Sequence, residues 1–476
     1  MIRYILGRVL RIEGIVMLLP CLVALIYQER QGIVYLCCGA VIFLIGFALS
    51  AKKPRDTAFY QKDGFAAVAL SWIVISLFGA IPFVITREIP FYIDALFEIV
   101  SGFTTTGASI LQDVEALSHA SLIWRSFSHW IGGMGVLVFL LMLMPGEGGS
   151  RMNLMRAESP GPSVSKFVPH VRDTAIRLYQ IYIALTLAEI GLLILSGMAC
   201  FDAVCISFGT AGTGGFGVLN TSCASYTAIQ QIIITVFMIM FGMNFTFYYL
   251  ILRKKAGMAL RMEEVRAYII VILVAIGLIT INIMTLYPTF GDALRNASFQ
   301  VGSVITTTGF STVDFNLWPQ LSRMILLALM FIGACAGSTG GGLKVSRVLI
   351  LGKTIRRELK SVAHPRSVNK IRMDGQQVPH ETLRSINVYL VIFILIFIVS
   401  FLVISLDNFS MEANFSAVAA TINNIGPGLD IVGPAGHYAD FSVLSKLVLS
   451  FDMLVGRLEL LPMLILFLPS TWKRRG

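Results

Sequence analysis

The chain of 476 residues is 56% hydrophobic and only 13% charged, and its mean hydropathy is +0.78. Because soluble globular domains carry about 25% charged residues, this composition excludes a soluble multidomain protein and fits a chain folded in membrane lipid. The net charge of +10 does not indicate nucleic-acid binding, since the basic residues are confined to particular loops.

The N-terminal stretch MIRYILGRVLRIEG alternates three arginines with apolar residues at helical spacing. This pattern predicts an interfacial helix that leads into the first membrane span. Apolar segments at about 12–27 and 33–50 then predict an opening pair of helices.

After this pair, one unit is predicted to recur four times. Each unit has an outward span, a short half-hydrophobic segment ending in Thr/Gly-rich residues, and a returning span. The Thr/Gly-rich stretches are SGFTTTGAS (101–109), GTAGTGGFG (209–217), SVITTTGFST (303–312) and AATINNIGPGL (419–429), which align Gly107, Gly215, Gly309 and Gly426. The predicted divisions are 1–56 for the N-terminal segment and helix pair, then repeats at 57–150, 151–260, 261–372 and 373–476. The literal G-x-G-x-x-G in the second stretch does not predict a dinucleotide site, because no βαβ unit surrounds it.

Basic residues gather in alternate loops of this topology. They cluster at 52–62, 151–177, 253–266, 353–372 and 473–475, whereas the intervening loops carry more of the acids. The positive-inside rule therefore places the basic loops and both termini in the cytoplasm. Basic loops fall on one side only if the half-hydrophobic segments do not cross, so we expect ten membrane-crossing helices and four re-entrant segments. The acids on the outer side could attract cations, or could be ordinary solvated loop residues.

The Thr/Gly-rich stretches are expected to be non-helical backbone at membrane depth. Such backbone is tolerated only when it is buried in protein or lines a water-filled path. Four of these stretches can direct a ring of carbonyls at one axis, and carbonyls can replace the hydration shell of a cation. Glycine suits the turn because it tolerates a positive φ. Tight helix packing by small residues is an equal alternative for any single stretch, but four in register favour an ion path.

A glycine-rich segment at residues 337–342 interrupts the apolar run at 322–352. Each glycine costs about 1 kcal/mol in a helix interior, so the second helix of the third repeat is predicted to break there. The segment is not a phosphate-binding loop, because Leu343 separates Gly342 from Lys344 and Val345 follows. A kink that serves only helix packing remains an alternative.

Arg457 is a charge well inside the last apolar span, where charged residues normally face a cavity or a partner. A structural pair with Asp452, with Glu459 or with a neighbouring helix is the alternative to a role in a pore. Cys200, Cys205 and Cys223 fall near the outer side, and a disulfide among them stays open. No metal-ligand spacing or nucleophile motif supports an enzyme.

Further motifs carry a family resemblance. They are RAESPGP (156–162), GSTGGGLKVSRV (337–348), RRELKSVAHPR (356–366) and GRLELLP (456–462). With the four Thr/Gly-rich stretches, they make nearly the whole chain resemble the Trk/Ktr/HKT superfamily of potassium transporters, and within it the bacterial TrkH-type family.

The resemblance implies that the four aligned glycines belong to a potassium selectivity filter, lined by carbonyls of the two residues before each. The implied filter residues are Thr105, Thr106, Gly107, Thr213, Gly214, Gly215, Thr307, Thr308, Gly309, Asn424, Ile425 and Gly426. Glycine rather than serine at position 107 resembles the potassium-selective pattern of the superfamily. The implied gate comprises Gly337, Ser338, Thr339, Gly340, Gly341, Gly342 and Arg457, which would project into the pore.

The predicted fold class is an all-α polytopic membrane protein, with four pseudo-symmetric helix–pore-loop–helix repeats around a central pore, preceded by an extra helix pair. The resemblance implies potassium uptake across the bacterial inner membrane, with K⁺ as substrate and no covalently bound cofactor. It also implies a homodimer and a cytosolic TrkA-type nucleotide-binding regulatory ring. A symporter coupling K⁺ to H⁺ or Na⁺ is the alternative function, with Glu189 as the main candidate acid, and a membrane-embedded enzyme is a remote one.

Overall fold

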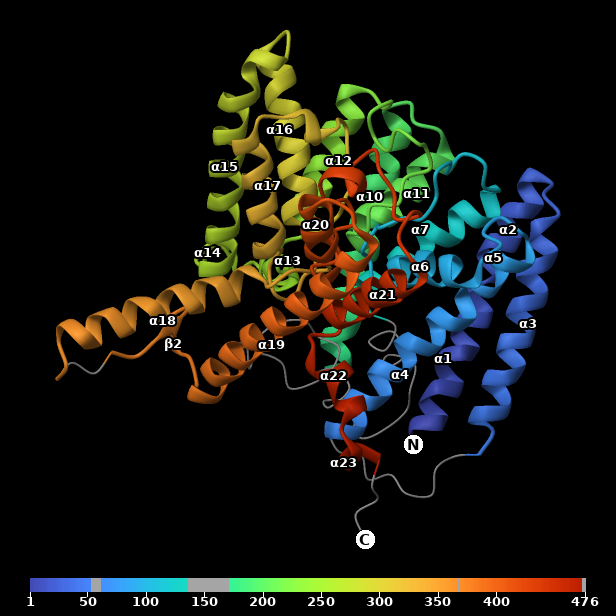
Figure 1. The fold of residues 1–476 in the computed structure, drawn as a ribbon, viewed down its shortest axis with the longest axis horizontal. Coiled ribbons are helices and arrows are strands. Elements are labelled where there is room, and N and C mark those ends of the chain that lie inside the picture. Colours follow the sequence, from blue (N-terminus) through green and yellow to red (C-terminus); the bar gives the residue numbers. More distant parts are fainter. Residues whose placement is uncertain (53–60, 136–170, 367–368, 473–476) are drawn as a thin grey trace.

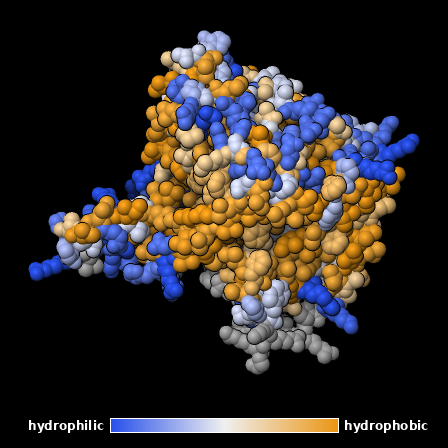
Figure 2. Space-filling model, viewed as in Figure 1, coloured by the Kyte–Doolittle hydropathy of each residue, from blue (hydrophilic) through white to orange (hydrophobic). Residues whose placement is uncertain are grey.

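The computed structural model describes residues 1–52, 61–135, 171–366 and 369–472. This part of the chain is helical apart from one hairpin, in which β1 (Arg372–Met373) pairs antiparallel with β2 (Gln376–Gln377). The helices form one bundle (Figure 1), and a hydrophobic belt crosses its surface between hydrophilic ends (Figure 2). Within the described ranges, six helices are long and apolar enough to cross a membrane, and a bent helix pair makes a seventh candidate. The chain is therefore an all-α polytopic membrane protein.

An extra helix pair precedes the repeats. α1 (Ile2–Val16) and α2 (Leu18–Tyr27) form one candidate span of 26 residues, which packs against α3 (Gln31–Ser50). A Cβ atom on Gly14 of α1 would lie 2.5 Å from the carbonyl oxygen of Gly39 in α3, so the two backbones touch. The sequence predicted an interfacial helix in residues 1–14 that leads into a span at about 12–27. Here residues 2–27 form one candidate span, because Gly14 packs directly against α3.

Four groups of helices follow this pair along the chain, and we call them the first to the fourth repeat. The first contains α4 (Gln61–Gly79), α5 (Ile81–Ile85), α6 (Tyr92–Phe103) and α7 (His119–Gly133). The second contains α10 (Val171–Leu195), α11 (Cys200–Gly212), α12 (Ala228–Phe241), α13 (Phe245–Leu252) and α14 (Ala256–Ala259). The third contains α15 (Glu263–Ile283), α16 (Phe290–Ile305), α17 (Gln320–Ile332) and α18 (Val345–Ala363). The fourth contains α19 (His380–Ile404), α20 (Met411–Ile422), α21 (Val443–Arg457), α22 (Leu461–Leu464) and α23 (Pro469–Trp472).

Short 3₁₀ turns lie in the connections, at η1 (Met284–Leu286), η2 (Phe315–Leu317), η3 (Ser405–Asp407), η4 (Asp430–Val432) and η5 (Ile465–Phe467). We call α6, α11, α16 and α20 the half-helices, because each is only 12 to 16 residues long. All seven cysteines lie in the described part of the chain and are free thiols.

The returning helices are shorter than the sequence predicts. A break was expected only in the third repeat, between α17 and α18, and it is present there. In the second repeat, however, α12 and α13 meet at an angle of 90°. The reason is local: a Cβ atom on Gly242 would lie 2.5 Å from the Tyr268 hydroxyl, and the Asn244 side chain caps α13 by accepting the Thr246 amide at 2.9 Å. In the fourth repeat α21 ends at Arg457, and Glu459 and Leu460 have positive φ.

α18 leaves the bundle sideways, together with the hairpin and the start of α19 (Figure 1). Three of its apolar side chains are strongly exposed: Ile355 (63%), Leu359 (67%) and Val362 (81%). The RAESPGP motif and the predicted boundaries at 56/57 and 150/151 lie outside the described residues.

Candidate functional site

The four half-helices end in the same backbone motif. Two residues before each aligned glycine, a non-glycine residue has φ between 55° and 58°; these residues are Thr105, Thr213, Thr307 and Asn424. The next residue donates its N–H to a carbonyl five residues earlier at 2.8 to 2.9 Å: Thr106 to Ser101, Gly214 to Gly209, Thr308 to Ser303 and Ile425 to Ala420. This Schellman-type end stops each helix and turns the chain into a short irregular segment.

The four irregular segments close into a ring, which we call the glycine ring (residues 105–107, 213–215, 307–309 and 424–426). Its four aligned glycines have φ between 80° and 96°. A Cβ atom on Gly107 would lie 2.0 Å from the Gly214 oxygen, one on Gly215 2.1 Å from the Thr308 oxygen, one on Gly309 2.2 Å from the Ile425 oxygen, and one on Gly426 2.6 Å from the Thr106 oxygen. Each glycine therefore abuts a carbonyl of the next repeat, in the order 1–2–3–4–1.

The first and third segments are held by side chains of their own half-helices. Glu98 accepts the Ile110 amide at 3.0 Å and the Ser109 hydroxyl at 2.9 Å. Ser303 donates its hydroxyl to the Phe310 carbonyl at 2.6 Å. Both anchors bind the backbone just beyond the ring glycine, so they fix the direction in which each segment leaves the ring.

The fourth and second segments are held by side chains from elsewhere in the chain. The Tyr438 hydroxyl donates to the Gly426 carbonyl at 2.8 Å. His129 of α7 contacts both the first half-helix and Phe216, with ring nitrogens 2.7 Å from the Gly102 oxygen and 3.2 Å from the Phe216 nitrogen. Each quarter of the ring therefore has a different chemical support.

A buried ion pair reinforces the first quarter. Arg125 of α7 lies 2.7 Å from Glu98, with the two side chains 2% and 0% exposed. The Arg125 guanidinium also lies 4.1 Å from the centre of the Phe216 ring, so it connects the first and second repeats. Sequence reasoning missed Glu98, Arg125 and His129, although a charged residue inside an apolar helix is a usable signal.

Replacing Arg125 by alanine is expected to lower the free energy of unfolding by about 3–5 kcal/mol, because the Glu98 carboxylate stays buried without its ion partner. Arg323→Ala, which removes an exposed ion pair to Glu412 at 2.9 Å, is the matched control and should cost about 0–1 kcal/mol. Thermal unfolding in detergent, followed by tryptophan fluorescence, compares the two. Equal losses would contradict a supporting role for the buried pair.

The loop between α17 and α18 (residues 333–344) lies against the half-helix end of the ring. Its Gly341 amide donates to the Thr307 hydroxyl at 2.6 Å. A Cβ atom on Gly340 would lie 2.7 Å from the Thr306 oxygen, and one on Gly341 2.4 Å from the Asn423 oxygen. The glycines that break the helix therefore let this loop approach the third and fourth segments closely.

Glu264, in the first turn of α15, holds the same loop from the other side. It accepts the Ala336 amide at 2.6 Å and the Ser346 amide at 3.2 Å, and the Asn244 side chain donates to it at 3.2 Å. No pattern in the sequence marks Glu264 as a contact of this loop, because a carboxylate at a helix start is ordinarily exposed.

Arg457 at the end of α21 is 8% exposed and binds backbone carbonyls of two other repeats. It donates to the Thr339 oxygen of the α17–α18 loop at 2.7 Å, to the Gly133 oxygen at 2.8 Å, and to the Gly132 oxygen. The nearby acids have partners of their own: Asp452 accepts from Ser400 at 2.7 Å, and Glu459 pairs with Arg347. Arg457 thus joins the fourth repeat to the loop and to the end of α7.

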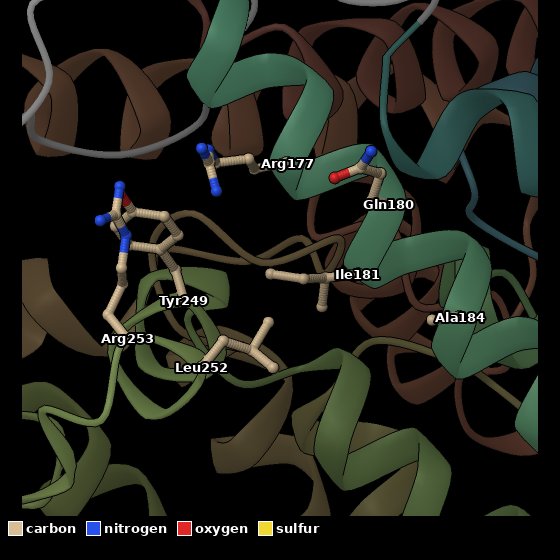
Figure 3. A pocket seen from close by; sticks show the side chains of 7 residues that line it. All are labelled: Arg177, Gln180, Ile181, Ala184, Tyr249, Leu252 and Arg253. Atoms are coloured by element: carbon tan, nitrogen blue, oxygen red, sulfur yellow. The ribbon is translucent and has the colours of Figure 1, made fainter.

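The sequence-predicted filter residues are therefore brought together in one ring. Of the predicted gate residues, Gly340 and Gly341 contact this ring from one side, and Arg457 contacts Thr339 of the same loop. A separate cavity of about 310 Å³ lies between α10 and α13, and its lining includes Arg177, Ile181 and Arg253 (Figure 3). No residue of the glycine ring or of the α17–α18 loop lines this cavity.

The fold and the ring define a polytopic membrane protein in which one chain supplies four half-helix repeats around enclosed backbone carbonyls. A family model described as "TrkH: Cation transport protein" matches residues 34–474. The chain belongs to the TrkH family.

Individual relatives agree over nearly the full length. The chain is 38% identical over 467 residues to the Trk system potassium uptake protein TrkH of Salmonella typhimurium, with 96% of each chain covered. It is 33% identical over 469 residues to the Trk system potassium uptake protein TrkG of Escherichia coli, with 96% of this chain and 95% of that one covered. The crystal structure of the potassium transporter TrkH from Vibrio parahaemolyticus matches with a TM-score of 0.89 and 33% identity, over 99% of both chains. The predicted family and fold class are confirmed.

Proposed function

We propose that this chain takes up K⁺ across the plasma membrane through the glycine ring. The observation that supports this proposal is the closed contact of each ring glycine with a carbonyl of the next repeat. Ring carbonyls replace the ion's hydration shell, and the four half-helix C-termini direct the negative ends of their dipoles at the same place. The relatives named above are potassium uptake proteins. The proposed filter is the glycine ring, residue for residue as the sequence predicts.

The proposed gate is the α17–α18 loop with Arg457. Its support is the hydrogen bond from Gly341 to Thr307 and the contact of Arg457 with the Thr339 carbonyl. The positive charge of Arg457 on the ion path opposes occupancy by K⁺. The α17–α18 loop occupies space directly beside two ring segments. In this proposal the structure corresponds to a closed state, which opens when the loop leaves the ring.

Thr307→Val is expected to raise K⁺ flux through the isolated protein about fivefold, because it removes the acceptor for the Gly341 amide and a buried hydrogen bond contributes about 1 kcal/mol. Thr105→Val is the matched control: it changes the equivalent position of the first segment, where the hydroxyl has no hydrogen-bond partner in the described structure. Flux into proteoliposomes measures both. A similar increase in the two variants would contradict the proposed contact between gate and filter.

The proposed setting is a bacterial inner membrane with both termini in the cytoplasm. The positive-inside rule supports this orientation, since α18 with its basic residues lies toward the side of the bundle that carries the N-terminus (Figure 1). We further propose a homodimer, supported by the exposed apolar side chains of α18. A cytosolic TrkA-type ring that docks on the basic loops follows from the family resemblance alone.

Symport of K⁺ with H⁺ or Na⁺ is the second candidate. It is favoured by Glu189 of α10, a carboxylate whose side chain is completely buried in a membrane-spanning helix. Buried carboxylates in such helices commonly mark proton or ion pathways.

Reversal potentials of the purified protein in asymmetric K⁺/Na⁺ and pH gradients decide between the two candidates. A Nernstian response to K⁺ that is independent of pH is expected for the proposed channel. A shift with pH that disappears in Glu189→Gln would establish symport instead. Absence of cation permeability under every regulatory condition would overturn both and favour a different kind of membrane protein.

A further inference from the structure

His129 lies behind the second segment of the glycine ring, where it is completely buried. Its Nδ1 atom is 2.7 Å from the Gly102 carbonyl oxygen, and the Phe216 amide donates to its Nε2 atom at 3.2 Å. The imidazole also fills the space beside Gly214, where a Cβ atom would lie 2.2 Å from His129 Cγ. The side chain thus joins the end of the first half-helix to the second ring segment.

The two contacts fix the chemical form of the imidazole. A carbonyl oxygen can only accept, so Nδ1 must carry the hydrogen that faces Gly102. A backbone N–H can only donate, so Nε2 must present its lone pair to Phe216. His129 is therefore neutral, in the Nδ1–H tautomer, in this arrangement. A second proton on Nε2 would place two donors against each other.

The hydrogen bond to Phe216 also orients the neighbouring carbonyl. The Phe216 N–H and the Gly215 carbonyl belong to one planar trans peptide, in which the two groups point in opposite directions. Because the N–H points to His129, the Gly215 carbonyl points away from α7. The fourth repeat differs, since the carbonyl of the equivalent Gly426 accepts a hydrogen bond from Tyr438.

We propose that His129 is a positioning residue for ion selectivity: by accepting the Phe216 amide, it directs the Gly215 carbonyl toward the ion at the outer end of the filter. This inference rests on the proposed function. In the second repeat, His129 orients the Gly215 carbonyl through the Phe216 amide. In the fourth repeat, by contrast, the Gly426 carbonyl accepts a hydrogen bond from Tyr438. This role does not require protonation of His129, because the neutral imidazole accepts the Phe216 amide.

Three substitutions test this role. His129→Leu keeps a similar volume but leaves the buried Phe216 amide without an acceptor, so the K⁺ over Na⁺ permeability ratio is expected to fall about tenfold, equivalent to about 1.4 kcal/mol. His129→Gln can donate to Gly102 and accept from Phe216, so it is expected to retain most of the ratio. His129→Asn is one bond shorter and should reach Gly102 but not Phe216, which gives a folded variant with the same loss if the leucine variant does not fold.

Tyr182→Phe is the control for general damage near His129. Its hydroxyl donates to the carbonyl of the adjacent Trp130 at 2.9 Å, so its loss should lower the unfolding temperature and leave the permeability ratio unchanged. Unchanged ratios in His129→Leu and His129→Asn would overturn the inference, as would equal losses in the glutamine and leucine variants. If wild-type protein passes no cations at all, the proposed function fails. If the wild-type protein is selective for K⁺ and the His129 variants keep its permeability ratio, the proposed function stands without this inference.

Discussion

Gly107→Ser is expected to lower the K⁺ over Na⁺ permeability ratio by about tenfold or more, since tenfold corresponds to only about 1.4 kcal/mol. Gly107 has φ of 81°, and a Cβ atom there would lie 2.0 Å from the Gly214 carbonyl oxygen. Serine would therefore be strained by about 1–2 kcal/mol and would also push that carbonyl out of the ring. Reversal potentials under bi-ionic K⁺/Na⁺ conditions measure the change.

Gly277→Ser provides the matched control for this substitution. Gly277 lies in a membrane-spanning helix, α15, where an added Cβ atom would meet nothing within 4 Å. The control should keep the wild-type reversal potential. An unchanged potential in Gly107→Ser, in a protein that is folded and conducts, would contradict the assignment of the ring as the filter.

Arg457→Ala is expected to increase K⁺ flux in the absence of any regulatory subunit by about tenfold or more. The substitution removes hydrogen bonds to the Thr339, Gly132 and Gly133 carbonyls together with a positive charge. Hydrogen bonds from charged groups contribute about 1.5–3 kcal/mol, and each 1.4 kcal/mol changes a closed-to-open equilibrium tenfold. Open probability in planar bilayers, recorded without nucleotide, measures this effect.

Two further variants separate the effect of the lost positive charge from the effect of the lost hydrogen bonds. Arg457→Gln removes the charge and keeps an amide donor, so its flux should lie between wild type and the alanine variant. Lys446→Gln removes a cation from the same helix, where Lys446 pairs with Asp94 at 2.6 Å, and should leave the flux low. If Arg457→Ala conducts no more than wild type, the loop is not held closed by this side chain.

The half-helices and the aligned glycines could be predicted because their backbone conformation restricts which residue types can occupy these positions. A positive φ at a crowded turn selects glycine, and the structure gives all four aligned glycines this conformation. The break before α18 was predictable for the same reason, since residues 337–342 are glycine-rich in an apolar run. The assignment of individual ring residues to ion coordination remains a prediction.

Long-range contacts were beyond the reach of the sequence. His129 and Glu264 act on backbone amides 87 and 72 residues away, and no local pattern marks such partners. The bend at Gly242 was missed because a single glycine usually remains in a helix, and the sequence does not show the close approach of Tyr268. The interfacial helix predicted in residues 1–14 rested on the interleaved arginines, whereas residues 2–27 form one candidate span in which Gly14 packs against Gly39 of α3.

The four different anchors behind the glycine ring have a consequence for how this protein can change over time. In a channel assembled from four identical subunits, one codon change alters every quadrant at once. Here a carboxylate, an imidazole, a serine hydroxyl and a phenol each support one quadrant, through Glu98, His129, Ser303 and Tyr438. A single mutation therefore alters the support of one quarter of the ring, and the ring can change in small steps, one anchor at a time.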